Sequence, residues 1–151
     1  MVKKFLIQGI ALIILIFTAL AFSAGRFPDL LNQNQNLTEI SVKNIKLKVE
    51  VADSQEKRKK GLGGRDNLAS ASGMLFTFQK TGYYNFWMKG MKIPIDIIWI
   101  KEAQVVDIHK NVSPEDQSIF TPKVGVDSVL EVNGGFSDNY GIMIGDSITK
   151  H

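Results

Sequence analysis

The stretch that decides the fold is IPIDIIWI, residues 93–100. Its β-branched and aromatic side chains favour an extended strand over a helix. The polar segment KEAQ (101–104) follows, and a second strand-like run then covers 105–109. Two such runs separated by a short polar segment are typical of a hairpin, so the sequence predicts a β-hairpin over 93–109.

Further short strand patterns lie on both sides of this hairpin. Apolar residues alternate with Lys and Glu over 45–51, the period of a strand with one buried face. Strand composition also occurs in GMLFTF (73–78), YNFWM (84–88), SVLEVN (128–133) and IMIGDSI (142–148), the last with a Gly-Asp turn inside it. One short exposed helix is predicted over about 54–60 and one helical turn over 136–140. Many short strands with little helix predict a mainly β domain, either a single compact β-sandwich or a small barrel with one or two short helices.

The amino-terminal region has a different character. Residues 5–22, FLIQGIALIILIFTALAF, carry no charge and would form a hydrophobic helix of about 27 Å, close to the thickness of a bilayer core. Lys3 and Lys4 precede this run, which predicts a cytoplasmic amino terminus. Residues 1–24 are therefore interpreted as a signal peptide or as a membrane anchor. Both interpretations predict an extracytoplasmic domain, periplasmic or anchored to the outer face of the cytoplasmic membrane.

Composition limits the remaining possibilities. Residues 25–39 are rich in Asn and Gln and predict a flexible linker, so the β domain is expected over 40–151. Lys3 and Lys4 account for two of the 18 Lys and Arg residues, which leaves 16 against 15 Asp and Glu. This near balance argues against a nucleic-acid partner. Because the chain has no Cys and only two His, neither a metal site nor a cofactor is predicted.

Six motifs occur in a characteristic order: GLGGRDNL (61–68), GMLFTF (73–78), FWMKGM (86–91), IPIDIIWI (93–100), VLEVNGG (129–135) and GIMIGD (141–146). In these motifs the chain resembles the domain of unknown function 192 family over about 45–148. The resemblance implies a mainly β fold of one domain, often behind a bacterial signal peptide or anchor, and it brings no established activity. The chain departs from the family pattern at Gly63, where Met is usual, and at Gly90-Met91, where Asn-Thr is usual.

The candidate ligand-binding residues are Arg65, Trp87, Lys89, Asp96 and Glu131. Asp96 lies inside an apolar strand, where an unpaired carboxylate would cost several kcal/mol, so it is expected to have a partner, best supplied by Arg65 or Lys89. The alternative is a purely structural Asp in an ion pair or a turn. Trp87 beside Lys89 is typical of a cleft that stacks on a ring and binds an anion, although Trp87 packed into the core is the competing interpretation.

These residues lead to two functional hypotheses. The first is a binding or accessory module whose Trp/Lys/Arg/Asp cleft takes a small polar ligand, a glycan or a protein segment, with membrane contact through residues 5–22 if that run is retained. The second is a hydrolase that uses Asp96 and Glu131 as an acid/base pair, which requires the two carboxyl groups to face one groove. No serine lies in a recognisable nucleophile motif, so the sequence leaves the biochemical activity open.

Overall fold

The computed structural model describes residues 37–151. The predicted signal peptide or anchor and most of the predicted linker lie outside these residues. In the described part of the chain, every helix is too short and too polar to span a bilayer.

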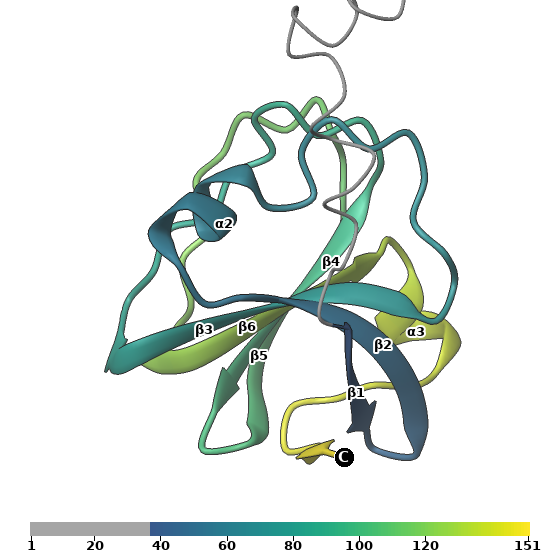
Figure 1. Ribbon diagram of the computed structural model, residues 1–151, viewed down its shortest axis with the longest axis vertical. Helices are drawn as coiled ribbons and strands as arrows, with labels where there is room; N and C mark the ends of the chain where they lie inside the picture. Colours follow the sequence, from purple (N-terminus) through teal and green to yellow (C-terminus); the bar gives the residue numbers. More distant parts are fainter. Residues whose placement is uncertain (1–36) are drawn as a thin grey trace, which may run out of the picture. The chain divides into compact units, whose positions relative to one another are not determined.

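The described residues form one seven-stranded sheet with two short helices (Figure 1). The strands are β1 (Leu37–Val42), β2 (Ile45–Ala52), β3 (Ser72–Gly82), β4 (Ile95–Lys101), β5 (Gln104–Val112), β6 (Val126–Asn133) and β7 (Ile148–Lys150), and the helices are α2 (Gln55–Lys60) and α3 (Phe136–Asn139). Their order in the sheet is β5-β4-β6-β3-β2-β1-β7. The strands β2 and β3 pair in parallel, and the other neighbours pair antiparallel. The predicted mainly β class and the predicted hairpin β4–β5 are both confirmed.

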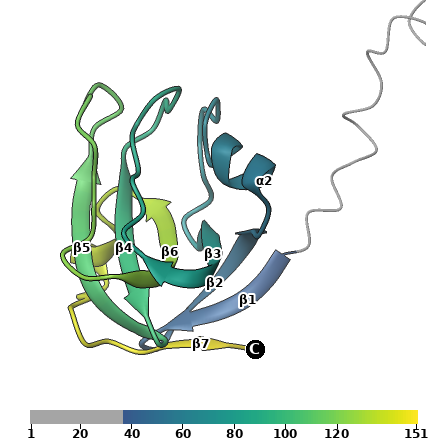
Figure 2. The same cartoon turned by 90° about the vertical axis from the view of Figure 1, so that its left-hand side faces the viewer.

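The sheet curls into a half barrel whose two edges meet at one end (Figure 2). Gln104 at the start of β5 forms an isolated β-bridge with Ser147, directly before β7. The backbone N–H of Ile148 donates to the carbonyl oxygen of Ala103 at 2.8 Å. At the other end the edges stay apart, and α2 and the long connections β3–β4 and β5–β6 project from the sheet there (Figure 2).

A hydrophobic core lies on each face of the sheet, because successive side chains of a strand point to opposite faces. One core contains Ile98 and Leu130 and packs against β1, β2 and α3. The other contains Ile97, Trp99 and Phe76 and lies under α2 and the projecting connections. All residues of β4 from Ile95 to Ile100 are buried, which explains why every one of them except Asp96 is apolar and the strand does not alternate.

One predicted strand is wrong, a second is confirmed only at its last residue, and one boundary moves. Residues 84–88 form only an isolated bridge at Phe86, whose ring instead packs edge-on against Phe76 with centroids 4.9 Å apart. Of the predicted strand 142–148, Ile148 alone belongs to a strand, β7, and Ser147 forms an isolated bridge. A turn at 144–145, where Gly145 adopts a left-handed backbone angle (φ 96°), interrupts the rest. The sheet begins at Leu37, three residues before the expected start of the domain.

Candidate functional site

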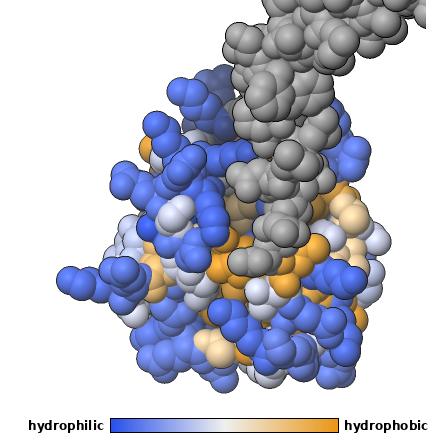
Figure 3. All heavy atoms as spheres, viewed as in Figure 1, coloured by the Kyte–Doolittle hydropathy of each residue, from blue (hydrophilic) through white to orange (hydrophobic). Residues whose placement is uncertain are grey.

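A pocket of about 480 Å³ lies between α2 and the β3–β4 connection, residues 83–94, and is called the α2 pocket below. Its walls are aromatic, its rim is basic and one carboxyl group lies at its base. The aromatic residues are Phe76, Phe78, Tyr84, Phe86 and Trp87, the basic residues are Arg58, Lys59, Lys60 and Lys89, and the carboxyl belongs to Glu131. Hydrophilic side chains gather over α2 on the surface as well (Figure 3), since none of the residues of this helix is buried.

The position of α2 follows from its caps. Ser54 is the N-cap, and its hydroxyl accepts a hydrogen bond from the backbone N–H of Lys57. The helix begins one residue later than the predicted 54–60, and Asp53, directly before the cap, forms an ion pair with Lys57 at 2.9 Å. Gly61 ends the helix with φ 52°. A Cβ atom on Gly61 would lie 3.6 Å from the Phe76 ring and 3.9 Å from Glu131 Oε2, so this glycine leaves the base of the pocket open.

Glu131 is the most unusual residue of the α2 pocket. It sits in the middle of β6, between Met74 of β3 and Ile97 of β4. Its Oε2 atom is buried and has no hydrogen-bond partner. Burial raises the pKa of Glu131 to about 8, against the opposing effect of the positive charge of Arg65. At neutral pH this carboxyl is therefore uncharged and carries an O–H donor.

The positive charge of Arg65 acts on Glu131, but its guanidinium group is paired with Glu50. Its two terminal nitrogens donate to the two carboxylate oxygens of Glu50, each at 2.6 Å. Glu50 on β2 pairs with Met74, which in turn pairs with Glu131, so the two glutamates lie in one row across the sheet. The bidentate geometry fixes the guanidinium group, and the structure does not bring Arg65 into contact with Asp96.

Trp87 lies on the surface and not in the core, with 54% of its area exposed. It follows Phe86, whose backbone is bonded to Phe120, and it precedes the turn at Gly90 (φ 79°). Lys89 is also exposed and lines the same pocket. The structure therefore brings three of the five candidate residues, Trp87, Lys89 and Glu131, to one pocket.

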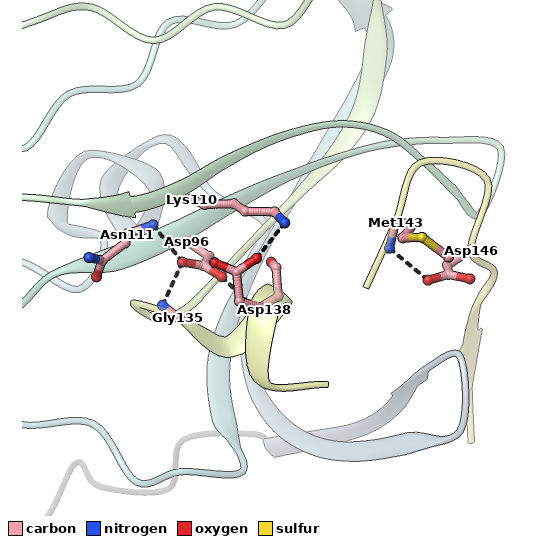
Figure 4. Close-up of polar contacts among 8 residues, drawn as sticks. Asp96, Lys110, Asn111, Gly135, Asp138, Met143 and Asp146 are labelled. Carbon is pink, nitrogen blue, oxygen red and sulfur yellow. Dashed lines mark hydrogen bonds and ion pairs between the residues drawn. The ribbon is translucent and has the colours of Figure 1, made fainter. Parts of the chain in front are cut away.

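Asp96 has a structural environment on the opposite face of the sheet (Figure 4). Its Oδ1 atom accepts from the backbone N–H groups of Asn111 at 2.7 Å and Gly135 at 2.8 Å. Its Oδ2 atom accepts from the N–H of Ser137 at 2.6 Å. The fully buried carboxyl thus joins β5 to the start of α3, and its partners are backbone amides rather than the expected side chain of Arg65 or Lys89.

The register of β4 and β6 also separates the two carboxyl groups of the hydrolase hypothesis. Asp96 pairs with Val132, and the next residue, Ile97, pairs with Glu131. Paired residues share a face and successive residues do not, so Asp96 and Glu131 point to opposite sides of the sheet. The structure does not bring them to one groove.

A second pocket of about 460 Å³ lies on the other side of Trp87 and Lys89 and is called the loop pocket below. Its other lining residues come from the same connection and from the β5–β6 connection, residues 113–125: Met88, Gly90, Pro114, Asp116, Gln117 and Ile119. Ile119 is 65% exposed. Pro114, Asp116, Gln117 and Ile119 were not predicted as site residues, although an isoleucine within the polar segment NVSPEDQSIFTP was a usable signal. Within residues 37–151, no three His, Cys, Asp or Glu side chains come together as a metal ion would require.

Two solved structures are similar to this chain. One is a candidate transcription regulator from Sinorhizobium meliloti, with 30% identity and a TM-score of 0.70, covering 75% of this chain and 91% of that one. The other is a protein of unknown function from Novosphingobium aromaticivorans, with 29% identity and a TM-score of 0.71, covering 74% of this chain and 83% of that one. No curated protein matches. The model of the DUF192 family, described as "Uncharacterized ACR", matches residues 38–150. This match spans most of the chain, which therefore belongs to the DUF192 family.

Proposed function

We propose that this protein is a binding module whose α2 pocket takes small carboxylates that carry a ring. The observation that carries the proposal is the buried Oε2 atom of Glu131, which has no partner and lies at the base of an open pocket. A buried polar atom without a hydrogen bond is costly, and a ligand oxygen placed there would remove that cost. Because the carboxyl is neutral at pH 7, it donates its proton to an anionic oxygen without charge repulsion.

The basic rim supports an anionic ligand. Lys59 and Lys60 of α2 lie on one side of the pocket and Lys89 on the other. None of these three lysines forms an ion pair with another residue in the range 37–151. Several lysines around one pocket create a positive electrostatic potential that attracts and orients carboxylates.

The aromatic walls support a ligand with a ring. The rings of Phe78 and Tyr84 stack with centroids 3.5 Å apart, and Phe86 packs edge-on between Phe76 and Trp99. These contacts hold a rigid apolar wall, while the exposed Trp87 leaves its ring free to cover a planar or sugar ring.

Binding without catalysis is the better supported of the two hypotheses. Hydrolysis by two carboxyl groups needs both beside the substrate, whereas Asp96 lies across the sheet from Glu131. In the α2 pocket, Glu131 is the one carboxyl among the lining residues. The extracytoplasmic location and the membrane contact through residues 5–22 remain predictions.

The chain contains its own probe for this proposal in its two Trp indoles. Trp99 is fully buried and donates its indole N–H to His109 at 2.8 Å, so its NMR signal serves as an internal reference. The full chain, labelled with ¹⁵N, is titrated with benzoate and glucuronate, and with their neutral counterparts benzyl alcohol and glucose. We expect a carboxylate to shift the Trp87 signal, the neutral compounds to shift it less, and the Trp99 signal to stay in place.

A matched pair of variants tests the role of the rim. Lys89→Ala removes a pocket lysine, and Lys101→Ala removes an exposed lysine at the end of β4 that lines neither pocket. Weaker binding in Lys89→Ala alone supports the proposal. It fails if no carboxylate shifts the Trp87 signal, or if the neutral compounds bind equally well.

The description of the Sinorhizobium meliloti protein concerns transcription, so duplex DNA belongs in the same experiment. The near balance of basic and acidic residues outside the amino-terminal region gives no reason to expect binding. A salt-dependent shift of backbone signals over α2 on adding DNA would favour a nucleic-acid partner instead.

A further inference from the structure

We propose that the ligand is an oligosaccharide that occupies both pockets at once, with an acidic sugar in the α2 pocket and a neutral sugar in the loop pocket. This inference rests on the proposed function and specifies the ligand class of the same site. It starts from the arrangement of three projections at the open end of the sheet: α2, the β3–β4 connection and the β5–β6 connection (Figure 2).

The central projection is shared by the two pockets. Trp87 and Lys89 line both the α2 pocket and the loop pocket, which have similar volumes of about 480 and 460 Å³. A ligand with one ring fills one pocket. A ligand with two or more linked rings crosses the exposed Trp87 and reaches the other pocket. Trp87 then contacts two neighbouring sugar rings of the same ligand.

The two pockets differ in charge, and this difference orients the ligand. The α2 pocket has a basic rim, whereas the one charged group that the loop pocket adds to Lys89 is Asp116. Hydrogen bonds from the hydroxyl and then the backbone N–H of Ser118 lower the pKa of Asp116, so its carboxyl is ionised at neutral pH. An ionised carboxylate accepts hydrogen bonds from hydroxyl groups and repels a second acid, which favours a neutral sugar there.

Apolar contact in the loop pocket fits the ring face of a sugar. The exposed side chain of Ile119 lines this pocket together with Trp87 and Pro114. The amide of Gln117 adds a donor and an acceptor for hydroxyl groups. This mixture of apolar faces and a few polar groups is typical of small-molecule sites.

The backbone of this region favours a saccharide over an extended peptide. A peptide that adds a strand needs free backbone N–H and C=O groups on its host. Between the two connections, Phe86 and Phe120 already exchange both of their backbone hydrogen bonds, at 2.9 and 2.8 Å. Those four backbone groups are therefore not available to a peptide strand, whereas the side chains of Asp116 and Gln117 offer hydrogen bonds to hydroxyl groups.

The test compares glucuronate with cellobiouronic acid, which adds one neutral glucose to the same acidic ring. Dissociation constants are measured on the full chain by calorimetry. Contact of the second ring with Trp87 and Ile119 predicts that the disaccharide binds about tenfold more tightly. Binding of the disaccharide with no measurable binding of the monosaccharide supports the proposal equally.

Two exposed isoleucines give a matched pair of variants. Ile119→Ala removes a wall of the loop pocket, and Ile144→Ala removes a side chain of similar exposure, 62%, from the turn before β7. We expect Ile119→Ala to reduce disaccharide affinity to that of glucuronate, and Ile144→Ala to change neither.

The other possible results show whether the two-pocket ligand or the proposed function itself is wrong. Equal affinity for the two sugars overturns the two-pocket ligand but leaves the proposed function in place. Binding of benzoate without binding of either sugar overturns the saccharide class in the same way. An acidic tetrapeptide is titrated in the same way. If it binds more tightly than the disaccharide, the ligand class is a protein segment and the saccharide proposal is overturned. Absence of binding by every carboxylate overturns the proposed function itself.

Discussion

Replacing the buried Glu131 by Gln should remove the pH dependence that this residue gives to stability. Burial raises the pKa of Glu131 from 4.5 to about 8, so the native state binds a proton that the unfolded chain releases. The contribution of this group therefore makes the native state less stable as pH rises from 4.5 to 8 and stays constant above that. Since one pKa unit corresponds to 1.36 kcal/mol, the full effect is about 5 kcal/mol, of which about 4 kcal/mol falls between pH 5 and pH 9.

The assay is urea denaturation of the natural chain and of Glu131→Gln at several pH values from 5 to 9. Gln has the same shape and stays neutral, so the difference between the two free energies of unfolding isolates the titration of Glu131, while other groups cancel. We expect the variant to gain about 4 kcal/mol relative to the natural chain across this range. Glu56→Gln, on the exposed face of α2, is the control and should follow the natural chain. A difference that stays flat between pH 5 and pH 9 would refute the reasoning, because it would mean that Glu131 is already ionised in the native state.

Two further predictions concern the other face of the sheet and the second core. The Asn side chain of Asp96→Asn cannot accept hydrogen bonds from all three backbone N–H groups, so this variant should lower the free energy of unfolding by about 3 kcal/mol in thermal or urea denaturation. The control is Asp138→Asn, which replaces a side chain that is 65% exposed and should cost less than about 1 kcal/mol. Equal losses in the two variants would contradict the structural role of Asp96. For His109, burial lowers the pKa below 6.5, and the indole N–H of Trp99 requires an unprotonated Nδ1. The stability that this histidine contributes is therefore complete above pH 6.5 and is lost as pH falls through its native pKa, so an NMR titration midpoint at or above 6.5 would count against this assignment.

Most of the sheet was predictable from local patterns. The almost wholly apolar β4 and the alternating β2 identify strands, because burial on two faces or on one face sets the spacing of apolar residues. Residues 84–88 gave a false strand because aromatic side chains serve packing and strand pairing equally well. The order of the strands, including the parallel pair β2–β3, depends on contacts between distant segments that no local pattern contains.

The site was predictable only in part, for a related reason. Trp87, Lys89 and Glu131 were unusual enough in type and context to be selected, and they share the α2 pocket. Asp96 was equally unusual, but its partners are backbone N–H groups, which every residue type except proline carries and which therefore leave no mark in a sequence. Ile119 was missed because only the folded connection shows which pocket its side chain lines.

The pairing of β1 with β7 has a consequence for biosynthesis. These strands lie near the two ends of the described chain, and their contact continues to the last residue, where the N–H of His151 donates to the carbonyl oxygen of Glu39 at 3.0 Å. Contacts between such distant segments form late and slow the folding of a domain. Until β7 has been synthesised and has left the ribosome, β1 has only β2 as a partner and stays unpaired on its other side.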